Sequence, residues 1–143
     1  MSHTVLSPSP AATQAVGRAL AGRLRPGDVV ALFGPLGMGK TCFVRGLAEG
    51  LGCAGTVSSP TYALVHEHPG PTPLAHFDMY RITSWEDLES TGFFDYLDQA
   101  FVLAVEWSEH IASALPPNCV RVAFAPGQGE NERMITIEHG GSA

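Results

Sequence analysis

Residues 34–41 read Gly-Pro-Leu-Gly-Met-Gly-Lys-Thr, a full match to the pattern G-x-x-x-x-G-K-[ST]. In such a loop the glycines let backbone N–H groups turn toward phosphate oxygens, the lysine reaches the β- and γ-phosphates, and the hydroxyl binds Mg²⁺. The pattern requires a strand before it and a helix after it. Residues 28–33 have the apolar run of a buried strand, and residues 40–51 resume helical spacing. A phosphate-binding loop is therefore favoured over an ordinary glycine-rich turn.

The nucleotide-binding residues predicted from this loop run from its first glycine to the second residue of the helix. They are Gly34, Pro35, Leu36, Gly37, Met38, Gly39, Lys40, Thr41 and Cys42.

Two acidic residues, Asp78 and Glu106, lie within or directly after predicted strands. Glu106 follows the apolar run 101–105, and Asp78 shares one face of its strand with His76 and Tyr80. Mg²⁺-assisted phosphoryl transfer needs a carboxylate near the metal and a group that orients the nucleophile, and open α/β sheets place such groups at strand ends. Both acids are candidates, against the alternatives of a strand-ending surface acid for Glu106 and a solvated edge-strand face for Asp78.

Three further patterns are weaker. Residues 58–61 (Ser-Ser-Pro-Thr) offer a loop hydroxyl at Thr61 that senses the γ-phosphate, although such clusters are usually plain loops. His66 and His68 share a strand face without further ligands nearby, which favours solvated histidines over a metal site. The acidic run 86–98 indicates a solvated helix face or, alternatively, a docking surface for a basic partner.

Composition excludes several classes of protein. The 143 residues carry 8 basic and 14 acidic side chains, and Lys40 is the only lysine. With a net charge of -6 the chain is a poor nucleic-acid binder, and it lacks the Asn-Lys-x-Asp motif of guanine-binding switches. No apolar segment is long enough to span a membrane, and no secretory signal is evident. Three cysteines without metal spacing suit a reducing cytoplasm, which is the expected location.

The periodicities predict one domain over residues 1–143, with residues 1–9 flexible. Helices are expected over 10–24, 40–51 and 84–99. Strands are expected over 28–33, 61–68, 74–81, 101–105, 119–124 and 134–138. The fold class is therefore α/β, a P-loop NTPase-like three-layer sandwich whose mixed central sheet has antiparallel edge strands.

In this order and spacing, the motifs resemble the TsaE (YjeE) family of P-loop ATPases in bacterial synthesis of tRNA N6-threonylcarbamoyladenosine. Four segments carry the resemblance besides the loop. They are Val57–Tyr62 (V-x-S-P-T-F in the family), His76–Arg81 (H-x-D-x-Y-R), Glu86–Gly92 (E-x-L-x-x-x-G) and Val105–Trp107 (V-E-W). Tyr62, Cys42 and Ser108 depart from common family residues without removing a phosphate, metal or water group.

The resemblance implies a subunit that binds ATP or ADP with Mg²⁺, hydrolyses ATP weakly alone, and acts with the proteins TsaD and TsaB. It implies that tRNA is reached only through those partners and that ATP hydrolysis resets the complex. By the family's motifs, Asp78 and Glu106 serve the metal and the attacking water, and Thr61 occupies the switch position.

The predicted roles place Lys40 on the phosphates, Thr41 with Glu106 or Asp78 on Mg²⁺, and Asp78 on the attacking water. Which of the two carboxylates contacts the metal directly stays open. Two alternatives remain. A small-molecule kinase normally needs an arginine-bearing lid, for which Arg121 and Arg133 are sparse. A nucleotide-gated binding module would show no significant turnover.

Overall fold

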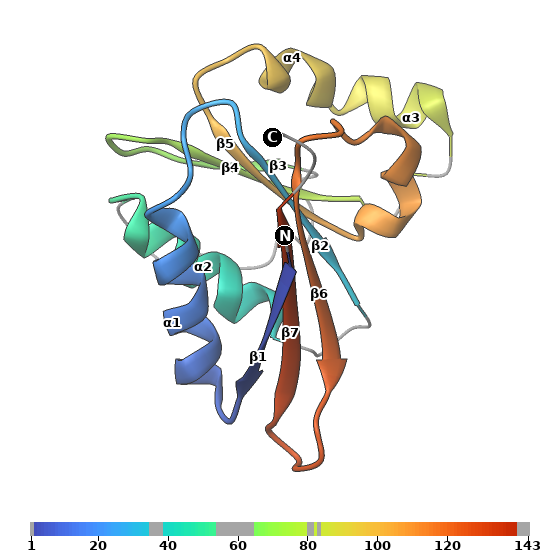
Figure 1. The fold of residues 1–143 in the computed structure, drawn as a ribbon. Coiled ribbons are helices and arrows are strands. Elements are labelled where there is room, and N and C mark those ends of the chain that lie inside the picture. The colour runs from blue at the N-terminus through green and yellow to red at the C-terminus, as the bar shows by residue number, and fades with distance from the viewer. Residues whose placement is uncertain (1, 35–38, 54–64, 80–81, 83, 140–143) are drawn as a thin grey trace.

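The chain is built around a mixed β-sheet, described here from a computed structural model that covers residues 2–34, 39–53, 65–79, 82 and 84–139. Within these residues the sheet has seven strands in the order β1-β7-β6-β2-β5-β4-β3 (Figure 1). The strands are β1 (Ser2–Ser7), β2 (Val29–Phe33), β3 (Val65–His68), β4 (Leu74–Asp78), β5 (Val102–Glu106), β6 (Val120–Pro126) and β7 (Arg133–His139).

Strands β6, β2, β5 and β4 run parallel at the centre of the sheet, and the outer pairings β1–β7, β6–β7 and β3–β4 are antiparallel. Strands β2 and β5 are nearly continuous apolar runs, as expected for strands covered on both faces. The observed sheet confirms the expected mixed architecture with antiparallel edges.

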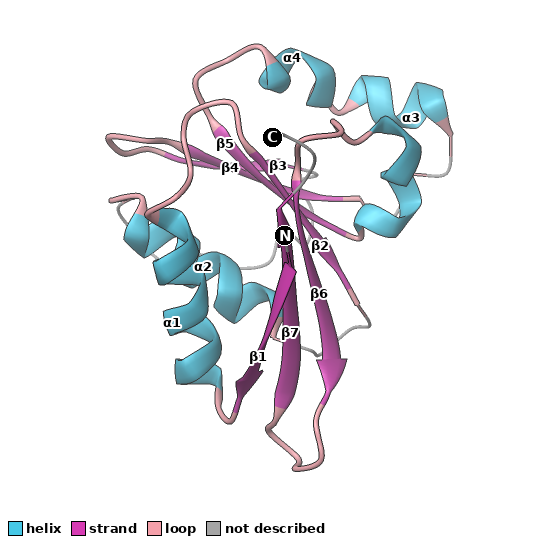
Figure 2. Ribbon diagram, in the orientation of Figure 1, coloured by secondary structure: helices cyan, strands magenta, loops and turns pink. Residues whose placement is uncertain are grey.

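Helices cover the sheet in two groups (Figure 2). They are α1 (Pro10–Ala21), α2 (Lys40–Gly50), α3 (Trp85–Ser90), α4 (Phe93–Leu97) and the 3-10 helix η1 (Ser108–Ala114). One apolar cluster joins α1 and α2 to the sheet through Val30 and Leu32 of β2, and a second joins α3, α4 and η1 to it through Val29 and Ala31. Alternate side chains of one strand thus enter two cores, which makes the fold a three-layer sandwich.

Helices α1 and α2 approach so closely that two positions must be glycine. A Cβ added at Gly17 would lie 2.1 Å from the carbonyl oxygen of Phe43, and one added at Gly46 would lie 1.9 Å from that of Gln14. Because α2 begins at Lys40, this contact also sets the position of the end of the predicted phosphate loop.

The structure corrects two sequence expectations. We expected residues 1–9 to be flexible, whereas Ser2–Ser7 form β1 and pair with β7, because the backbone of a Ser/Pro-rich segment still completes an open sheet edge. We expected one helix over 84–99, whereas α3 and α4 are separate, because Gly92 between them adopts φ 80°. The sequence interpretation also missed η1.

Two remaining features concern the expected environment. Among the described residues, no helix is long and apolar enough to cross a bilayer. The three cysteines are free, and burial raises the pKa values of the Cys53 and Cys119 thiols, which keeps those side chains protonated and unreactive.

Candidate functional site

Both described ends of the glycine-rich loop have backbone conformations that require glycine. Gly34 follows β2 with φ 132°, and a Cβ there would lie 2.6 Å from the carbonyl oxygen of Phe124. Gly39 precedes α2 with φ 89°. The predicted residues Pro35, Leu36, Gly37 and Met38 lie outside the described residues. The strand, the helix and the two flanking glycines therefore have the arrangement that a phosphate-binding loop needs.

Lys40, the first residue of α2, turns back toward the end of β2. Its Nζ donates a hydrogen bond to the carbonyl oxygen of Gly34 at 2.7 Å, although the residue is only 4% exposed. The same ammonium lies 4.4 Å from the ring centroid of Trp107, a cation–π contact. Lys40 is thus a buried cation that connects the start of α2 to the end of β2, where the loop begins.

Thr41 and Cys42 continue the first turn of α2, and both are half-buried. Backbone N–H groups of this turn have no partner within the helix, and the helix dipole is positive here. A cavity of about 210 Å³ borders Gly39 and Cys42 and is also lined by Thr13, Asn131 and Arg133. The sequence interpretation did not assign these three residues to the site, because they come from α1 and the β6–β7 turn, far from the loop in sequence.

Asp78 and Glu106 face each other across neighbouring strands. They are register partners in the parallel β4–β5 pair, and the N–H of Met79 donates to the carbonyl oxygen of Glu106 at 3.0 Å. Strand β5 also pairs with β2, so the carboxyl ends of all three strands meet at one edge of the sheet. The structure therefore brings together the two predicted acids at the edge where the loop begins.

Glu106 is held by a side chain whose role the sequence interpretation did not foresee. His76 is fully buried, and its Nε2 lies 2.5 Å from Oε2 of Glu106, which is itself only 6% exposed. Within the described residues, His76 Nδ1 has no hydrogen-bond partner. The alternation of His76 and Asp78 had indicated a shared face, but a hydrogen bond to an adjacent strand requires knowledge of the β4–β5 register.

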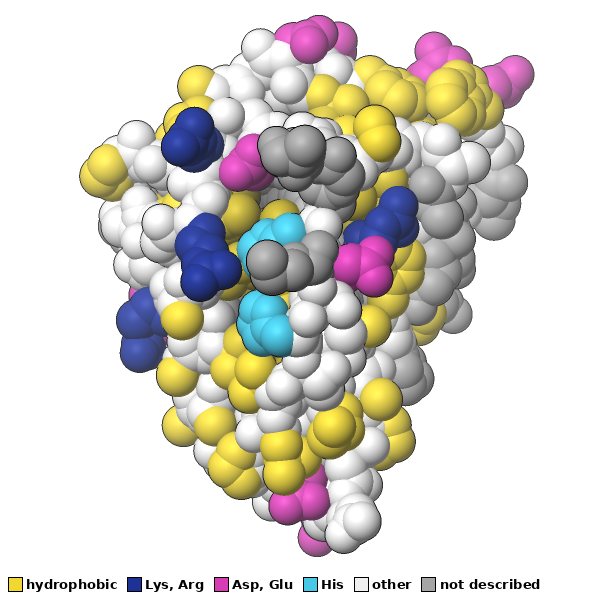
Figure 3. All heavy atoms as spheres, viewed as in Figure 1, with side chains coloured by type: hydrophobic (Ala, Val, Ile, Leu, Met, Phe, Trp, Pro, Cys, Tyr) yellow, Lys and Arg dark blue, Asp and Glu magenta, His cyan; other side chains and the backbone are white. Residues whose placement is uncertain are grey.

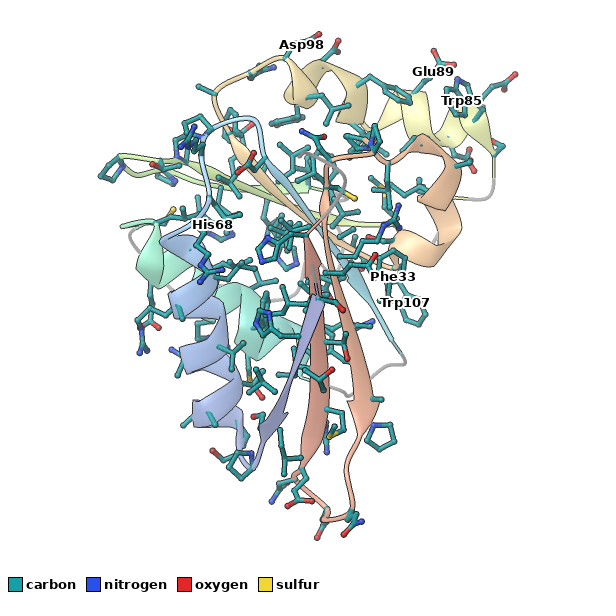
Figure 4. The ribbon with its side chains drawn as sticks, in the orientation of Figure 1. Phe33, His68, Trp85, Glu89, Asp98 and Trp107 are labelled. Atoms are coloured by element: carbon teal, nitrogen blue, oxygen red, sulfur yellow. The ribbon has the colours of Figure 1, made fainter. Side chains whose placement is uncertain are left out.

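Strand β4 lies between β3 and β5, so the solvated edge strand considered for Asp78 is excluded. Asp78 is half-buried, whereas the burial of Glu106 excludes an ordinary surface acid. Trp107, directly after Glu106, has φ 59°, a left-handed conformation that is strained for a tryptophan. Figure 4 shows Trp107 and Phe33, the last residue of β2, at the same end of the sheet.

The donor set suits a magnesium ion that shares its ligands with phosphate. The hydroxyl of Thr41 and the carboxylates of Asp78 and Glu106 are the hard oxygen donors that Mg²⁺ prefers. Within the described part of the chain, no three His, Cys, Asp or Glu residues are placed to hold a metal on their own.

The remaining candidates fall into two groups. Thr61, the predicted switch hydroxyl, lies outside the described residues. The rings of His66 and His68 lie 6.4 Å apart on β3, and the described residues provide no third metal ligand beside them.

Together these features define a class: α/β proteins with the P-loop NTPase-like fold, in which a buried strand, a glycine-rich loop and a helix meet carboxylates from the neighbouring strand ends. The family model "Threonylcarbamoyl adenosine biosynthesis protein TsaE" matches residues 7–135. The chain belongs to the TsaE family.

Similar proteins agree with that assignment. A TsaE protein of Bacillus subtilis is 38% identical over 130 residues, covering 90% of this chain and 80% of the relative. One of Treponema pallidum is 40% identical over 114 residues, covering 80% and 84%. The crystal structure of Bacillus subtilis YdiB superposes with a TM-score of 0.84 and 32% identity, covering 99% of this chain and 87% of that one.

Proposed function

We propose that this protein is a Mg²⁺-dependent ATPase subunit required for the threonylcarbamoyladenosine modification of tRNA, and that it acts with TsaD and TsaB. The place in that modification is supported by the family model and by relatives named for tRNA threonylcarbamoyladenosine biosynthesis. The nucleotide and the partners follow from the site chemistry and from the sequence resemblance.

The observation that carries the ATPase proposal is the position of Lys40. A lysine that is 4% exposed carries a cost of desolvation, which an anion beside the loop would offset. One acceptor of its Nζ is the Gly34 carbonyl oxygen, where the loop begins. Moving the ammonium from this carbonyl to phosphate oxygens is a short rearrangement that replaces a neutral acceptor with a charged one.

The carboxylates supply the second half of the chemistry. Bound Mg²⁺ would neutralise charge that develops on the phosphates. Thr41 and Glu106 would hold it, with Glu106 in turn oriented by His76, while Asp78 orients the attacking water. In this division the more buried carboxylate takes the metal and the more exposed one takes the water.

Weak activity without partners is part of the proposal, because the two arginines considered for a lid, Arg121 and Arg133, make other contacts. Arg133 donates hydrogen bonds to the carbonyl oxygens of Glu130 and Glu132, and the guanidinium of Arg121 lies 5.8 Å from the ring centroid of Phe33. Phosphoryl transfer is strongly accelerated by an arginine that reaches the transferring phosphate. A partner protein would supply or position such a group. The net charge of -6 agrees with tRNA being held by those partners.

The test is titration of ATP with Mg²⁺ into the wild-type protein and Lys40→Ala, followed by ADP formation with TsaD and TsaB present. Lys40→Ala should weaken ATP binding by about tenfold or more. Arg18→Ala removes an exposed cation on α1 and should leave binding unchanged. Unaltered binding in Lys40→Ala would overturn the nucleotide site. If ATP binds but no ADP forms even with the partners present, the protein is a nucleotide-gated binding module and the ATPase proposal is wrong.

A further inference from the structure

A groove with a mixed lining lies between α3 and η1. It encloses about 170 Å³. Its apolar lining comes from Ile82, Trp85, Leu88, Ile111 and Ala114, and its polar lining comes from Ser84 and Ser113. We call it, together with Phe94, the Trp85 groove.

Trp85 is 57% exposed, and its ring packs against Phe94 with the centroids 5.3 Å apart. An exposed tryptophan at the rim of a groove is typical of the anchor residues of protein interfaces. The groove is therefore a candidate contact surface.

Among the residues that the structure describes on α3 and α4, the charged side chains are all acidic. Residues 82–120 contain seven of the fourteen acidic residues and no lysine or arginine. Glu86, Glu89, Asp95 and Asp98 are exposed, and none of the four forms an ion pair with a described residue. Figure 3 shows acidic side chains at the end of the molecule where α3 and α4 lie, with hydrophobic side chains between them. Figure 4 labels Trp85 and Glu89 on α3, and Asp98 just beyond the carboxyl end of α4.

We infer that the Trp85 groove is the docking site for a basic, arginine- or lysine-bearing surface of a partner protein. The inference rests on the proposed function and assigns the surface through which the TsaD–TsaB complex is contacted. A guanidinium stacks well on an exposed tryptophan and pairs with carboxylates at the same time. A nucleic acid is excluded as the occupant, because its phosphates would be repelled by the acidic residues around the groove.

The groove is also connected to the nucleotide site through the chain. Trp85 follows Asp78 by seven residues, and the N–H of Ile82 donates to the carbonyl oxygen of Met79 at 3.1 Å. Met79 in turn donates to the carbonyl oxygen of Glu106. A partner that holds α3 therefore acts on the segment that carries Asp78, and this link makes ATP-dependent docking the expected behaviour.

The test measures binding of the full chain to purified TsaD–TsaB complex in the presence of ATP, by titration calorimetry at low and physiological salt. Glu89→Lys and Asp98→Lys reverse charges at or near the carboxyl ends of α3 and α4, where lysine agrees with the helix dipole, so both variants should fold. Trp85→Gln removes the anchor. The matched controls are Glu130→Lys and Leu6→Gln, which alter exposed residues on the β6–β7 turn and on β1.

Each groove variant should weaken binding by about tenfold, and the charge reversals should also flatten its salt dependence. The controls should bind within about twofold of wild type, as expected for residues outside a hot spot. Groove variants that bind like wild type would overturn the docking site and leave the proposed function intact. A wild-type protein that does not bind TsaD–TsaB would overturn both. Losses in Glu130→Lys and Leu6→Gln equal to those of the groove variants would overturn the assignment of binding to this groove.

Discussion

Nε2 of His76 lies 2.5 Å from Oε2 of Glu106, and both side chains are buried between the ends of β4 and β5. The contact fixes Oε2 of Glu106. It therefore also sets the direction of Oε1, the second oxygen of this carboxylate. A hydrogen-bond partner of a metal ligand strongly affects metal affinity, because it sets the orientation and basicity of that ligand. Variants of His76 can therefore test whether this histidine positions Glu106 in the proposed ATPase.

Replacing His76 with leucine should lower Mg²⁺-dependent ATP hydrolysis by about 10- to 100-fold while leaving ATP binding without Mg²⁺ close to wild type. The reason is that Glu106 loses its donor but Lys40 is unaltered. Mg²⁺ titration of ADP formation in the partner complex measures the first effect, and nucleotide binding in the presence of a chelator measures the second.

The control for this prediction is the conservative variant His76→Gln, whose amide N–H₂ can still donate to Glu106. Partial recovery of the Mg²⁺ response is expected, and thermal unfolding of both variants shows whether the fold survives. If His76→Leu lowers ATP binding equally with and without Mg²⁺, the histidine has a structural role only and the positioning role is excluded.

A second prediction concerns the contact that positions α2. A Cβ at Gly46 would lie 1.9 Å from the Gln14 carbonyl oxygen, so Gly46→Ala must push α1 and α2 apart. We expect the free energy of unfolding to fall by about 3 kcal/mol, as in other overpacked cores. Gly22→Ala is the matched control. Its Cβ would lie 3.6 Å from the nearest atom at φ -65°, and it should be neutral or stabilising by about 0.5 kcal/mol. Denaturant unfolding measures the free energy of unfolding of both variants. Equal values for Gly46→Ala and Gly22→Ala would contradict the observed helix contact.

Much of this architecture was predictable, because it depends on local patterns. The apolar run before Gly34 and the helical spacing after Gly39 predicted β2 and α2 with boundaries within about one residue. Glu106 was found because it follows a buried strand, and Asp78 because it shares a strand face with His76. Parallel topology then brings the two acids together.

What escaped prediction depends on strand register and on backbone conformation. The hydrogen bond of His76 exists because β4 pairs with β5 in one register, and nothing local to residue 76 encodes that pairing. Ser2–Ser7 form a strand only because β7 offers a free edge. The break between α3 and α4 at Gly92 was visible as a glycine, but the apolar spacing on either side continued and outweighed it.

The third prediction uses the contact between Lys40 and Trp107. The chain has two tryptophans, so Trp85→Phe leaves Trp107 as the only one. Adding ATP with Mg²⁺ to Trp85→Phe should change the tryptophan emission, because the ammonium now 4.4 Å from the indole ring would move toward phosphate. The reciprocal variant Trp107→Phe should lose most of this signal while still binding ATP. A nucleotide response that survives only in Trp107→Phe would contradict the assignment of Trp107 to the site.

The last prediction concerns acid stability and His68. Burial, followed by the positive charges that His76 and His66 can carry, lowers the pKa of His68 below its ordinary value of 6.5. The unfolded chain therefore binds this proton at a higher pH than the folded chain. The stability associated with neutral His68 is complete above pH 6.5 and is lost as the pH falls through the folded-state pKa.

His68→Gln should make the free energy of unfolding less dependent on pH between 6.5 and about 5, above the range where most carboxylates titrate. The hydrogen bond from the Cys53 thiol to the His68 backbone carbonyl survives the change, so the fold should be retained. Burial also lowers the pKa of His139, so His139→Gln should flatten the same window and the double variant should flatten it further. Urea unfolding at half-unit pH steps measures the slopes. A His68→Gln slope equal to wild type would mean that His68 is already solvated in the folded protein.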